Sequence, residues 1–230
     1  MKFGVVTFPG SNCDYDAFQA VVEGVSQEAV YLWHKEHDLQ GVDVVILPGG
    51  FSYGDYLRAG AIARFSPIMT EVMAHAKSGR PVLAICNGFQ VACEAGLLPG
   101  ALLRNASLRF ISRPAYLRVD SVDTQFTNAY SSGDVLRIPV AHGEGRFTAH
   151  ADTLSELEDT GRVLFRYCDS LGQVVDAENP NGSANNIAGI INAGGNVLGM
   201  MPHPERAIDP TLGRPDGKPL FRSLLAQVAA

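Results

Sequence analysis

The sequence feature that most constrains the fold is the stretch RPVLAICNGFQVACEAG at residues 80–96. Its four apolar residues at 82–85 predict a buried strand of a parallel sheet. This run ends at Cys86, and the Asn-Gly pair that follows is typical of a turn. The apolar spacing after the turn predicts a helix that ends near Gly96. A strand, a sharp turn and a helix, with a reactive side chain at the turn, form the geometry of a nucleophile elbow.

The predicted turn also suits a reactive thiol. A sharp turn needs small residues two positions before and after the nucleophile, and Ala84 and Gly88 supply them. A helix N-terminus carries unpaired N–H groups and a positive partial charge, which favour the thiolate form of Cys86. The alternative is that Cys86 is a core residue, since free cysteines are among the most buried residues of proteins. Motifs elsewhere in the sequence are needed to distinguish a reactive thiol from a core cysteine.

The composition excludes several classes of protein. The 230 residues are 46% hydrophobic and 18% charged, which indicates a single well-buried α/β domain over residues 1–230. A net charge of −6 argues against a nucleic-acid partner, and no apolar run reaches the length of a membrane span. The N-terminus lacks the pattern of a signal peptide, and the four cysteines show neither zinc nor disulfide spacing. We therefore expect a cytoplasmic protein in a reducing compartment, where a single thiol persists as a nucleophile.

Strand and helix patterns alternate over the first hundred residues. The predicted strands lie at 3–6, 29–33, 42–47 and 82–85. The predicted helices begin near residue 14, span 59–76 and follow Cys86. This alternation predicts an α/β fold with an open, mostly parallel sheet and helices on both faces.

The second half of the chain has a different pattern. Residues 102–138 are richer in alternating apolar and polar residues, which predicts a small antiparallel portion. Further strands are predicted at 162–166 and 174–176, and a helix at 220–228.

A glycine-rich loop follows the predicted strand at 42–47. Its sequence, PGGFSYGD, begins at Pro48 and contains Gly49 and Gly50. Glycines let backbone N–H groups approach a ligand closely, so this loop can bind an oxyanion; the alternative is a simple turn between strand and helix. It matches neither nucleotide-binding fingerprint, GxGxxG or GxxxxGK[ST]. Ligands of such folds collect at the carboxyl ends of the strands, which places this loop and Cys86 in one site.

A second chemical motif lies near the end of the chain, in PHPE at 202–205. Pro204 favours an extended backbone at His203, and residues two apart in an extended segment point to the same side. His203 and Glu205 can therefore touch, and an imidazole oriented by a carboxylate completes a Cys-His-acid triad. The alternative is a turn histidine beside prolines.

His34 and His37, three residues apart beside acidic residues, are the one pattern that resembles a metal site. No third ligand is positioned, and solvated charge clusters are common. We expect no metal here.

Taken together, RPVLAICNGFQ and PHPE resemble the class I, or triad-type, glutamine amidotransferases, whose domain has a flavodoxin-like sheet. PGGFSYGDYLRAGAIA, AHGEGRF, NPNGSANNIAGI and GNVLGMMPHPER are similar to the small glutaminase subunits of phosphoribosylformylglycinamidine synthase, and this similarity extends from Gly4 to Arg206. One departure is Ala84, where the class often has glycine; its small size still meets the need of the turn.

The resemblance implies a role for each matching residue. Cys86 is the nucleophile, His203 the base and acid, and Glu205 the residue that orients His203. The oxyanion and glutamine-binding positions correspond to Gly49, Gly50, Phe51, Asn87 and Gln90. The resemblance gives no individual role to His142, Glu144 or Arg146 of the HGEGR segment.

The resemblance also implies a substrate and partners. Glutamine is hydrolysed to glutamate and ammonia, and a large synthetase subunit uses the ammonia to convert formylglycinamide ribonucleotide to the amidine in purine biosynthesis. A third small subunit bridges the complex in some organisms. We expect no cofactor in this chain, and ATP and magnesium in the synthetase.

Three other functions are open at this point. The chain can serve a different synthetase, although the FSYGDYLRAGAIA and AHGEGRF matches argue against this. A stress-response hydrolase or chaperone-like module also places a cysteine at an elbow, but leaves PHPE unexplained. A binding protein with a vestigial site has no turnover that depends on Cys86.

Overall fold

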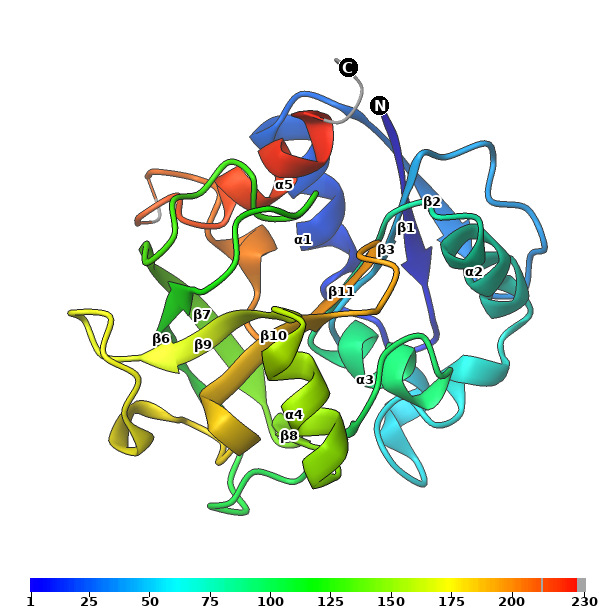
Figure 1. The fold of residues 1–230 in the computed structure, drawn as a ribbon. Coiled ribbons are helices and arrows are strands. Elements are labelled where there is room, and N and C mark those ends of the chain that lie inside the picture. Colours follow the sequence, from blue (N-terminus) through cyan, green and yellow to red (C-terminus); the bar gives the residue numbers. More distant parts are fainter. Residues whose placement is uncertain (212, 227–230) are drawn as a thin grey trace.

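A nine-stranded sheet runs through the centre of the molecule (Figure 1). The computed structural model describes residues 1–211 and 213–226. The strand order is β2-β1-β3-β4-β11-β10-β9-β6-β7, and β5 pairs separately with β8. The bounds of the strands are β1 Lys2–Thr7, β2 Glu28–Trp33, β3 Val44–Leu47, β4 Val82–Ile85, β5 Ala101–Leu103, β6 Ile111–Val119, β7 Val135–His142, β8 Arg146–Thr148, β9 Val163–Cys168, β10 Ile187–Ile191 and β11 Val197–Met200.

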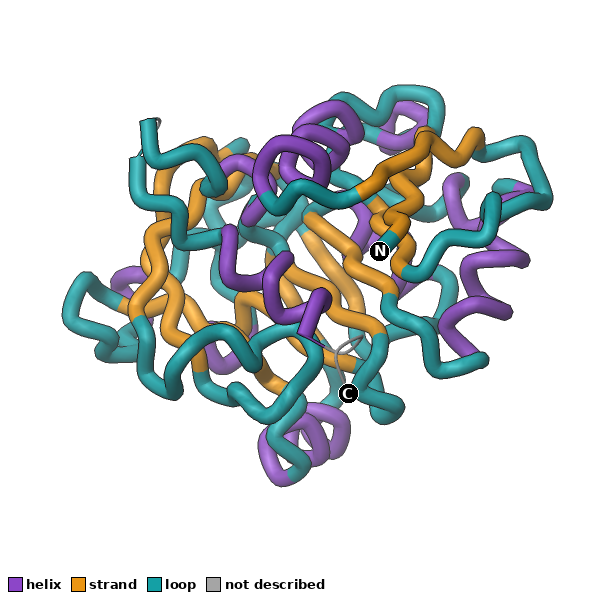
Figure 2. The backbone as a smooth tube through the Cα atoms, turned by 90° about the horizontal axis from the view of Figure 1, so that it is seen from above, coloured by secondary structure: helices purple, strands orange, loops and turns teal. Residues whose placement is uncertain are grey.

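The strands from β2 to β11 in this order are all parallel. The connection from β1 to β2 runs one way across the sheet, and that from β3 to β4 runs the other way. Right-handed crossovers therefore place α1 (Asp14–Gln19) and α2 (Pro67–Lys77) on opposite faces. Figure 2 shows helices on both sides of the strands. Because both faces are covered, β3 and β4 are buried along their whole length.

Three more helices complete the layers. α3 (Asn87–Glu94) starts directly after β4, and α4 (Ala151–Asp159) precedes β9. α5 (Lys218–Leu225) packs beside the π-helical turn at Ala20–Gly24 that continues α1. None of the described helices has both the length and the apolar character that crossing a membrane requires.

The antiparallel part consists of β10, β9, β6 and β7, which continue the same sheet. β6 and β7 pair in register from the Ile111–His142 pair to the Arg118–Val135 pair. Buried residues recur at every second position of β7 and from Ala115 onward in β6, as expected for strands with one face on the core. The predicted fold class is confirmed, and its antiparallel portion is larger than the sequence pattern indicated.

Two local predictions were wrong. Only the second half of 59–76 is an α-helix, because α2 begins at Pro67 and the residues before it form turns and a 3₁₀ segment at Ala63–Phe65. Ser66 has a ψ of 139°, the extended conformation that a following proline favours. Residues 174–176 form no strand, and Asp176–Glu178 is a 3₁₀ turn.

The predicted C-terminal helix exists as α5, and the part of that prediction at 227–228 lies outside the described residues. The two neighbouring parallel strands β3 and β4 end at the same edge of the sheet, where Gly49 and Cys86 follow them. β11 pairs with β4 on the other side, and His203 follows it after a short turn. Three separate segments therefore converge at one edge.

Candidate active site

Cys86 lies at a sharp turn between β4 and α3. Its backbone has φ 50° and ψ −106°, a combination that a non-glycine residue adopts only where the surrounding fold enforces it. A Cβ atom at Gly88 would lie 2.0 Å from the carbonyl oxygen of Leu47, so the turn accepts only glycine there. The side chain of Cys86 is 5% exposed, and its Sγ contacts the carbonyl oxygen of Ala141 at 3.7 Å. The predicted elbow therefore exists, and its geometry depends on the packing of α3 against β3.

His203 and Glu205 form a buried pair beside Cys86. The imidazole Nδ1 lies 2.6 Å from Oε1 of Glu205, and neither side chain is more than 1% exposed. Burial alone lowers the pKa of His203, but the charges of Glu205 and Cys86 outweigh it, so the pKa is well above its ordinary value. Nε2 is buried without a hydrogen-bond partner among the described residues, which leaves this nitrogen free to take a proton from a thiol.

The glycine loop after β3 approaches this pair closely. A Cβ atom at Gly49 would lie 2.7 Å from Cε1 of His203, and one at Gly50 would lie 2.8 Å from the backbone nitrogen of Asn12. Gly50 has a φ of +136°, which favours glycine. The N–H of Phe51 donates to the carbonyl of Gly10 at 3.1 Å, so Phe51 contributes its ring to the site rather than a free donor.

Asn87 links the glycine loop to α3. The N–H groups of a first helical turn have no partner within the helix, so the backbone N–H of Asn87 is available to an oxyanion. Its side-chain Oδ1 accepts a hydrogen bond from the N–H of Ser52 at 3.1 Å, and its Nδ2 donates to Asp55 and Gln90. No local sequence pattern indicated this second role, in which the Asn87 side chain joins the glycine loop to α3.

A cavity of about 160 Å³ opens over Cys86. We call it the Cys86 cavity; it is lined by Gly50, Phe51, Asp55, Cys86, Gln90, Phe110, Ala141, His142, Gly143 and Glu144. Nε2 of Gln90 donates to the carbonyl of Glu144 at 2.6 Å. Burial and the charge of Glu144 raise the pKa of Asp55 to about 6, although the hydrogen bond from Asn87 lowers it. Two acidic side chains thus face a cavity that also contains the thiol.

His142 holds the segment that forms one wall of this cavity. Its Nδ1 lies 3.1 Å from Oδ1 of Asn105, and its Nε2 lies 3.5 Å from Nδ2 of Asn181. Asn105 and Asn181 also bond the backbone of Gly145. Burial and the charge of His203 lower the pKa of His142 to about 4. The ring is therefore neutral near pH 7 and serves as a structural link.

Cys13 is a second thiol near the pair. Single ligand atoms of Cys13, His203 and Glu205 all lie within 4.8 Å of one another, and Nη2 of Arg206 lies 3.2 Å from the sulfur of Cys13. These are donor types of a zinc site, but His203 and Glu205 bond each other and Cys13 contacts Arg206. The sequence motifs did not single out Cys13 as a site residue.

The two histidines with metal-like spacing serve different contacts. Nδ1 of His34 lies 2.8 Å from the hydroxyl of Tyr53, whereas Nδ1 of His37 lies 3.4 Å from Glu71. These contacts account for both rings without a shared ligand.

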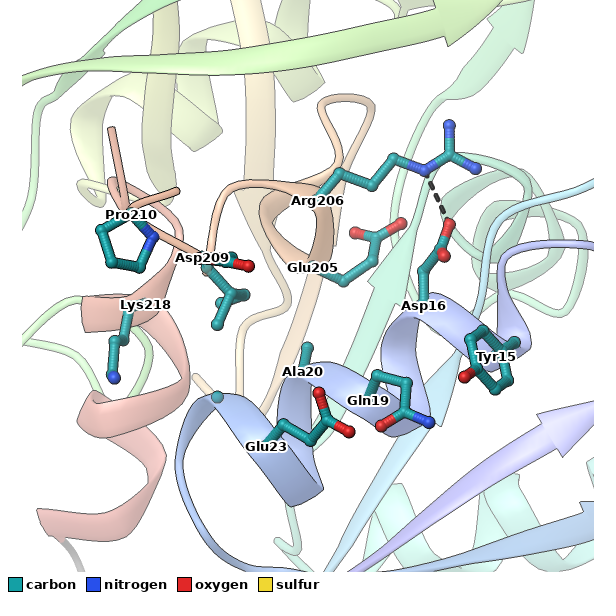
Figure 3. Close-up of a pocket in the computed structure, with 12 residues that line it drawn as sticks. Tyr15, Asp16, Gln19, Ala20, Glu23, Glu205, Arg206, Asp209, Pro210 and Lys218 are labelled. Atoms are coloured by element: carbon teal, nitrogen blue, oxygen red, sulfur yellow. Dashed lines mark hydrogen bonds and ion pairs between the residues drawn. The ribbon is translucent and has the colours of Figure 1, made fainter. Parts of the chain in front are cut away.

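A larger groove of about 640 Å³ lies beside Glu205, between α1 and the start of α5 (Figure 3). Glu205 and Arg206 both border it. Arg206 reaches across to Asp16 of α1, with Nε 2.8 Å from Oδ2 (Figure 3). The partly exposed Arg206 side chain therefore borders both this groove and the region of Cys13.

Comparisons with known proteins agree on one family. The model of the CobB/CobQ-like glutamine amidotransferase domain matches residues 1–216. Phosphoribosylformylglycinamidine synthase subunit PurQ of Salinibacter ruber is 57% identical over 228 residues, covering 99% of this chain and 97% of that protein. The PurQ subunit of Chlorobaculum tepidum is 59% identical over 226 residues, covering 98% and 97%.

A solved structure supports the same assignment. A chain in the structure of PurLQS from Thermotoga maritima has a TM-score of 0.87 and 43% identity, covering 99% of this chain and 98% of that one. The chain belongs to the CobB/CobQ-like glutamine amidotransferases and, within them, to the family of phosphoribosylformylglycinamidine synthase PurQ subunits.

Proposed function

We propose that the chain hydrolyses glutamine through Cys86, His203 and Glu205 and delivers the ammonia to a synthetase subunit. This synthetase converts formylglycinamide ribonucleotide to the amidine in purine biosynthesis. The observation that carries the proposal is the strained Cys86 turn beside a buried His203–Glu205 pair and a glycine loop. An amide is a poor electrophile, so its hydrolysis near neutral pH needs both an activated nucleophile and a stabilised tetrahedral anion.

The first step is attack by Cys86 on the side-chain carboxamide of glutamine. Nε2 of His203 accepts the thiol proton, and Glu205 stabilises the resulting imidazolium from the opposite ring nitrogen. The N–H groups of Gly50 and Asn87 are the candidate donors to the oxyanion. Losing one such donor costs about 10²- to 10³-fold in rate in comparable acyl-transfer sites.

The second step releases ammonia and then glutamate. His203 returns its proton to the departing nitrogen, the C–N bond breaks, and a γ-glutamyl thioester remains on Cys86. The neutral imidazole then activates water, which cleaves the thioester and regenerates the thiol.

Asp55 and Glu144 give the Cys86 cavity its charge. A free amino acid carries an α-ammonium group, and two carboxylates facing the cavity complement it. Gln90 anchors the backbone of Glu144 at 2.6 Å, so we assign it a role in shaping the cavity around bound glutamine.

The use of ammonia requires partners. The sequence has no ATP-binding loop of a known type, so activation of the ribonucleotide falls to a large synthetase subunit with ATP and magnesium. A small bridging subunit is the expected third component. The name PurLQS of the Thermotoga maritima structure supports this arrangement. We expect the free subunit to have low glutaminase activity, and ammonia to pass between the sites without entering bulk water.

The test is glutamate release by the complex with Cys86→Ala. We expect this variant to lose glutamine-dependent activity and to keep ammonium-dependent synthesis, because the synthetase is untouched. Cys93→Ala is a matched control, since Cys93 lies on α3 outside the cavity over Cys86 and its sulfur donates to the carbonyl of Pro99. Glutamate release that persists at the wild-type rate in Cys86→Ala would contradict the proposal.

A further inference from the structure

The second half of the glycine loop has a strained backbone. Tyr53 and Asp55 have positive φ angles of 54° and 53°, and Leu57, two residues further on, has a φ of 74°. A residue with a Cβ atom adopts this left-handed conformation at a cost in free energy, so it persists only where its surroundings hold it. Gly50 and Asp55 of this loop both line the Cys86 cavity. Whatever holds the loop therefore also shapes the site.

The hydroxyl of Tyr53 attaches the loop to the body of the fold. Its oxygen lies 2.8 Å from Nδ1 of His34 and 2.9 Å from Oγ of Ser66. A phenol hydroxyl has one donor and two acceptor sites, so it can bond both partners at once. The rings of Tyr53 and His34 also meet edge to face, with centroids 5.6 Å apart. His34 and Ser66 are only 3% and 4% exposed, so both bonds are shielded from water.

His34 is itself fixed by its backbone. It follows β2 directly, and its N–H donates to the carbonyl of Thr7 at the end of β1, at 3.2 Å. Its carbonyl accepts from the N–H of Ile68 in the first turn of α2, at 3.1 Å. Two strands and a helix therefore hold the residue that the Tyr53 hydroxyl contacts, which makes His34 a rigid anchor.

Ser66 does not cap the helix that follows it. α2 begins at Pro67, and a serine just before a helix usually accepts a hydrogen bond from an N–H of the first turn. No such side-chain bond forms at Ser66, and its Oγ bonds the hydroxyl of Tyr53 instead. The Ser66 hydroxyl is thus used to hold the glycine loop rather than the end of its own helix.

The loop is held from the side of the thiol by a different residue. The side chain of Asn87 accepts from the N–H of Ser52 and donates to Asp55. The backbone N–H of Tyr53 adds a bond to the carbonyl of Pro9 at 2.6 Å. Asn87 therefore holds the loop from α3, and the hydroxyl of Tyr53 holds it from β2 and α2.

We propose that Tyr53 is a positioning residue, whose hydroxyl, bonded to His34 and Ser66, keeps the N–H of Gly50 and the carboxylate of Asp55 in place around bound glutamine. This inference rests on the proposed glutaminase function. Tyr53 acts through the strained loop rather than on the substrate itself. His34, which the sequence pattern placed beside a metal-like motif, has this hydrogen bond as its role.

The test follows two reactions of Cys86 in the assembled complex with Tyr53→Phe, which keeps the ring and removes the hydroxyl. Glutamine hydrolysis needs the loop, because an oxyanion forms. Methyl methanethiosulfonate has no carbonyl and forms none. The thiolate attacks its methylthio sulfur, a new S–S bond forms, and methanesulfinate leaves with the electron pair of the broken S–S bond. The mass of the peptide that contains Cys86 measures the rate of this second reaction.

We expect the loss to fall on the first reaction alone. In Tyr53→Phe, kcat/KM for glutamine should fall by about tenfold, less than the loss of about 10²- to 10³-fold that follows when an oxyanion donor is removed outright. The rate of modification by the thiosulfonate should stay within about twofold of the wild-type rate, and ammonium-dependent synthesis should be unchanged.

Three further variants serve as controls. Ser66→Ala should show the same pattern with a loss of about threefold, the effect of one neutral hydrogen bond, whereas Ser66→Thr keeps a hydroxyl and should retain the wild-type rate. Tyr53→Phe combined with Ser66→Ala should lose no more than Tyr53→Phe alone, because both changes remove the same interaction. Tyr56→Phe removes a hydroxyl from a neighbouring side chain that is 76% exposed, and both rates should stay unchanged.

The outcomes separate the inference from the function on which it rests. If the wild-type complex releases no glutamate that depends on Cys86, the proposed function fails and the inference fails with it. If the release depends on Cys86 but Tyr53→Phe keeps the wild-type kcat/KM, the inference alone is overturned. Equal losses in both reactions also overturn it, because the change then acts on the thiol or on the whole fold. If Tyr53→Phe does not fold, the same two rates in Ser66→Ala decide.

Discussion

Replacing Glu205 with glutamine separates the charge of the triad from its shape. The carboxylate lies 2.6 Å from Nδ1 of His203 in a fully buried pair. Burial lowers the pKa of His203, and the charges of Glu205 and then Cys86 raise it well above the ordinary value. Glutamine keeps an acceptor oxygen at the same position and removes the larger of these two charges. The burial of the imidazole is then opposed mainly by the weaker contribution of Cys86.

The expected loss of activity is large. Removing one partner of a buried ion pair costs about 3–5 kcal/mol, and every ~1.4 kcal/mol corresponds to a tenfold change in rate. If this cost falls on the imidazolium that forms during attack, kcat/KM for glutamine falls by about 10²- to 10⁴-fold. The pKa of His203 also falls, so its protonated form is lost at a lower pH. The alkaline limb of the kcat profile, which needs the protonated imidazole, therefore moves to lower pH.

The assay is glutamate release by the complex across the pH range in which the wild type is active. Glu205→Asp is the matched control, because it retains the charge and shortens only the reach of the carboxylate. Thermal unfolding of each variant checks that the fold is intact. A Glu205→Gln enzyme with wild-type kcat/KM and an unshifted alkaline limb refutes the assigned role of Glu205.

Three further predictions concern other parts of the site. Gly88→Ala places a Cβ atom 2.0 Å from the carbonyl oxygen of Leu47 and should lower the free energy of unfolding by about 3 kcal/mol or more. The control Gly41→Ala meets no atom within 4 Å and should lower it by only about 1–2 kcal/mol, because of its positive φ. Chemical denaturation measures both values, and equal losses would show that the turn at Cys86 is not tightly packed. The pKa of Asp55 is raised to about 6, so its negative charge forms as pH rises through this value, and the KM for glutamine should fall over the same range. Asp55→Asn should raise KM by about tenfold and abolish this pH dependence. If the substitution leaves the pH profile of KM unchanged, Asp55 does not recognise the α-ammonium group of glutamine. Asn181→Ala removes the donor that lies 2.8 Å from the buried carbonyl of Gly145 and leaves this carbonyl the longer hydrogen bond of 3.3 Å from Oγ of Ser183. The free energy of unfolding should fall by about 1–3 kcal/mol, a value that a surface control, Asn128→Ala, is not expected to reach.

Local sequence signals located several parts of the candidate site because each depends on neighbouring residues. The elbow at Cys86 follows from an apolar run, a turn pair and a helical spacing within one short segment. The contact between His203 and Glu205 was predicted from an extended segment, whereas Pro204–Arg206 forms a 3₁₀ turn that still brings the two side chains together. The alternation of strands and helices likewise indicated the parallel sheet. These features are set by backbone conformations that a few adjacent residues control.

Other parts of the site depend on contacts between distant segments. Cys13, Asp55 and Phe110 come from three different loops, and the folded sheet brings them to the same edge. The helix predicted at 59–76 was too long at its start for a different reason. The apolar spacing continues before Pro67, but the extended backbone of Ser66 before this proline prevents the helix from starting earlier.

Local sequence patterns were enough to place a thiol at a strand-to-helix turn and an imidazole beside a carboxylate near the end of the chain. The folded sheet brings these two segments and the glycine loop to one edge, where they enclose small cavities. The physical reason is that a turn is a local property of the backbone, whereas a cavity is the space left between side chains of segments that are far apart in sequence.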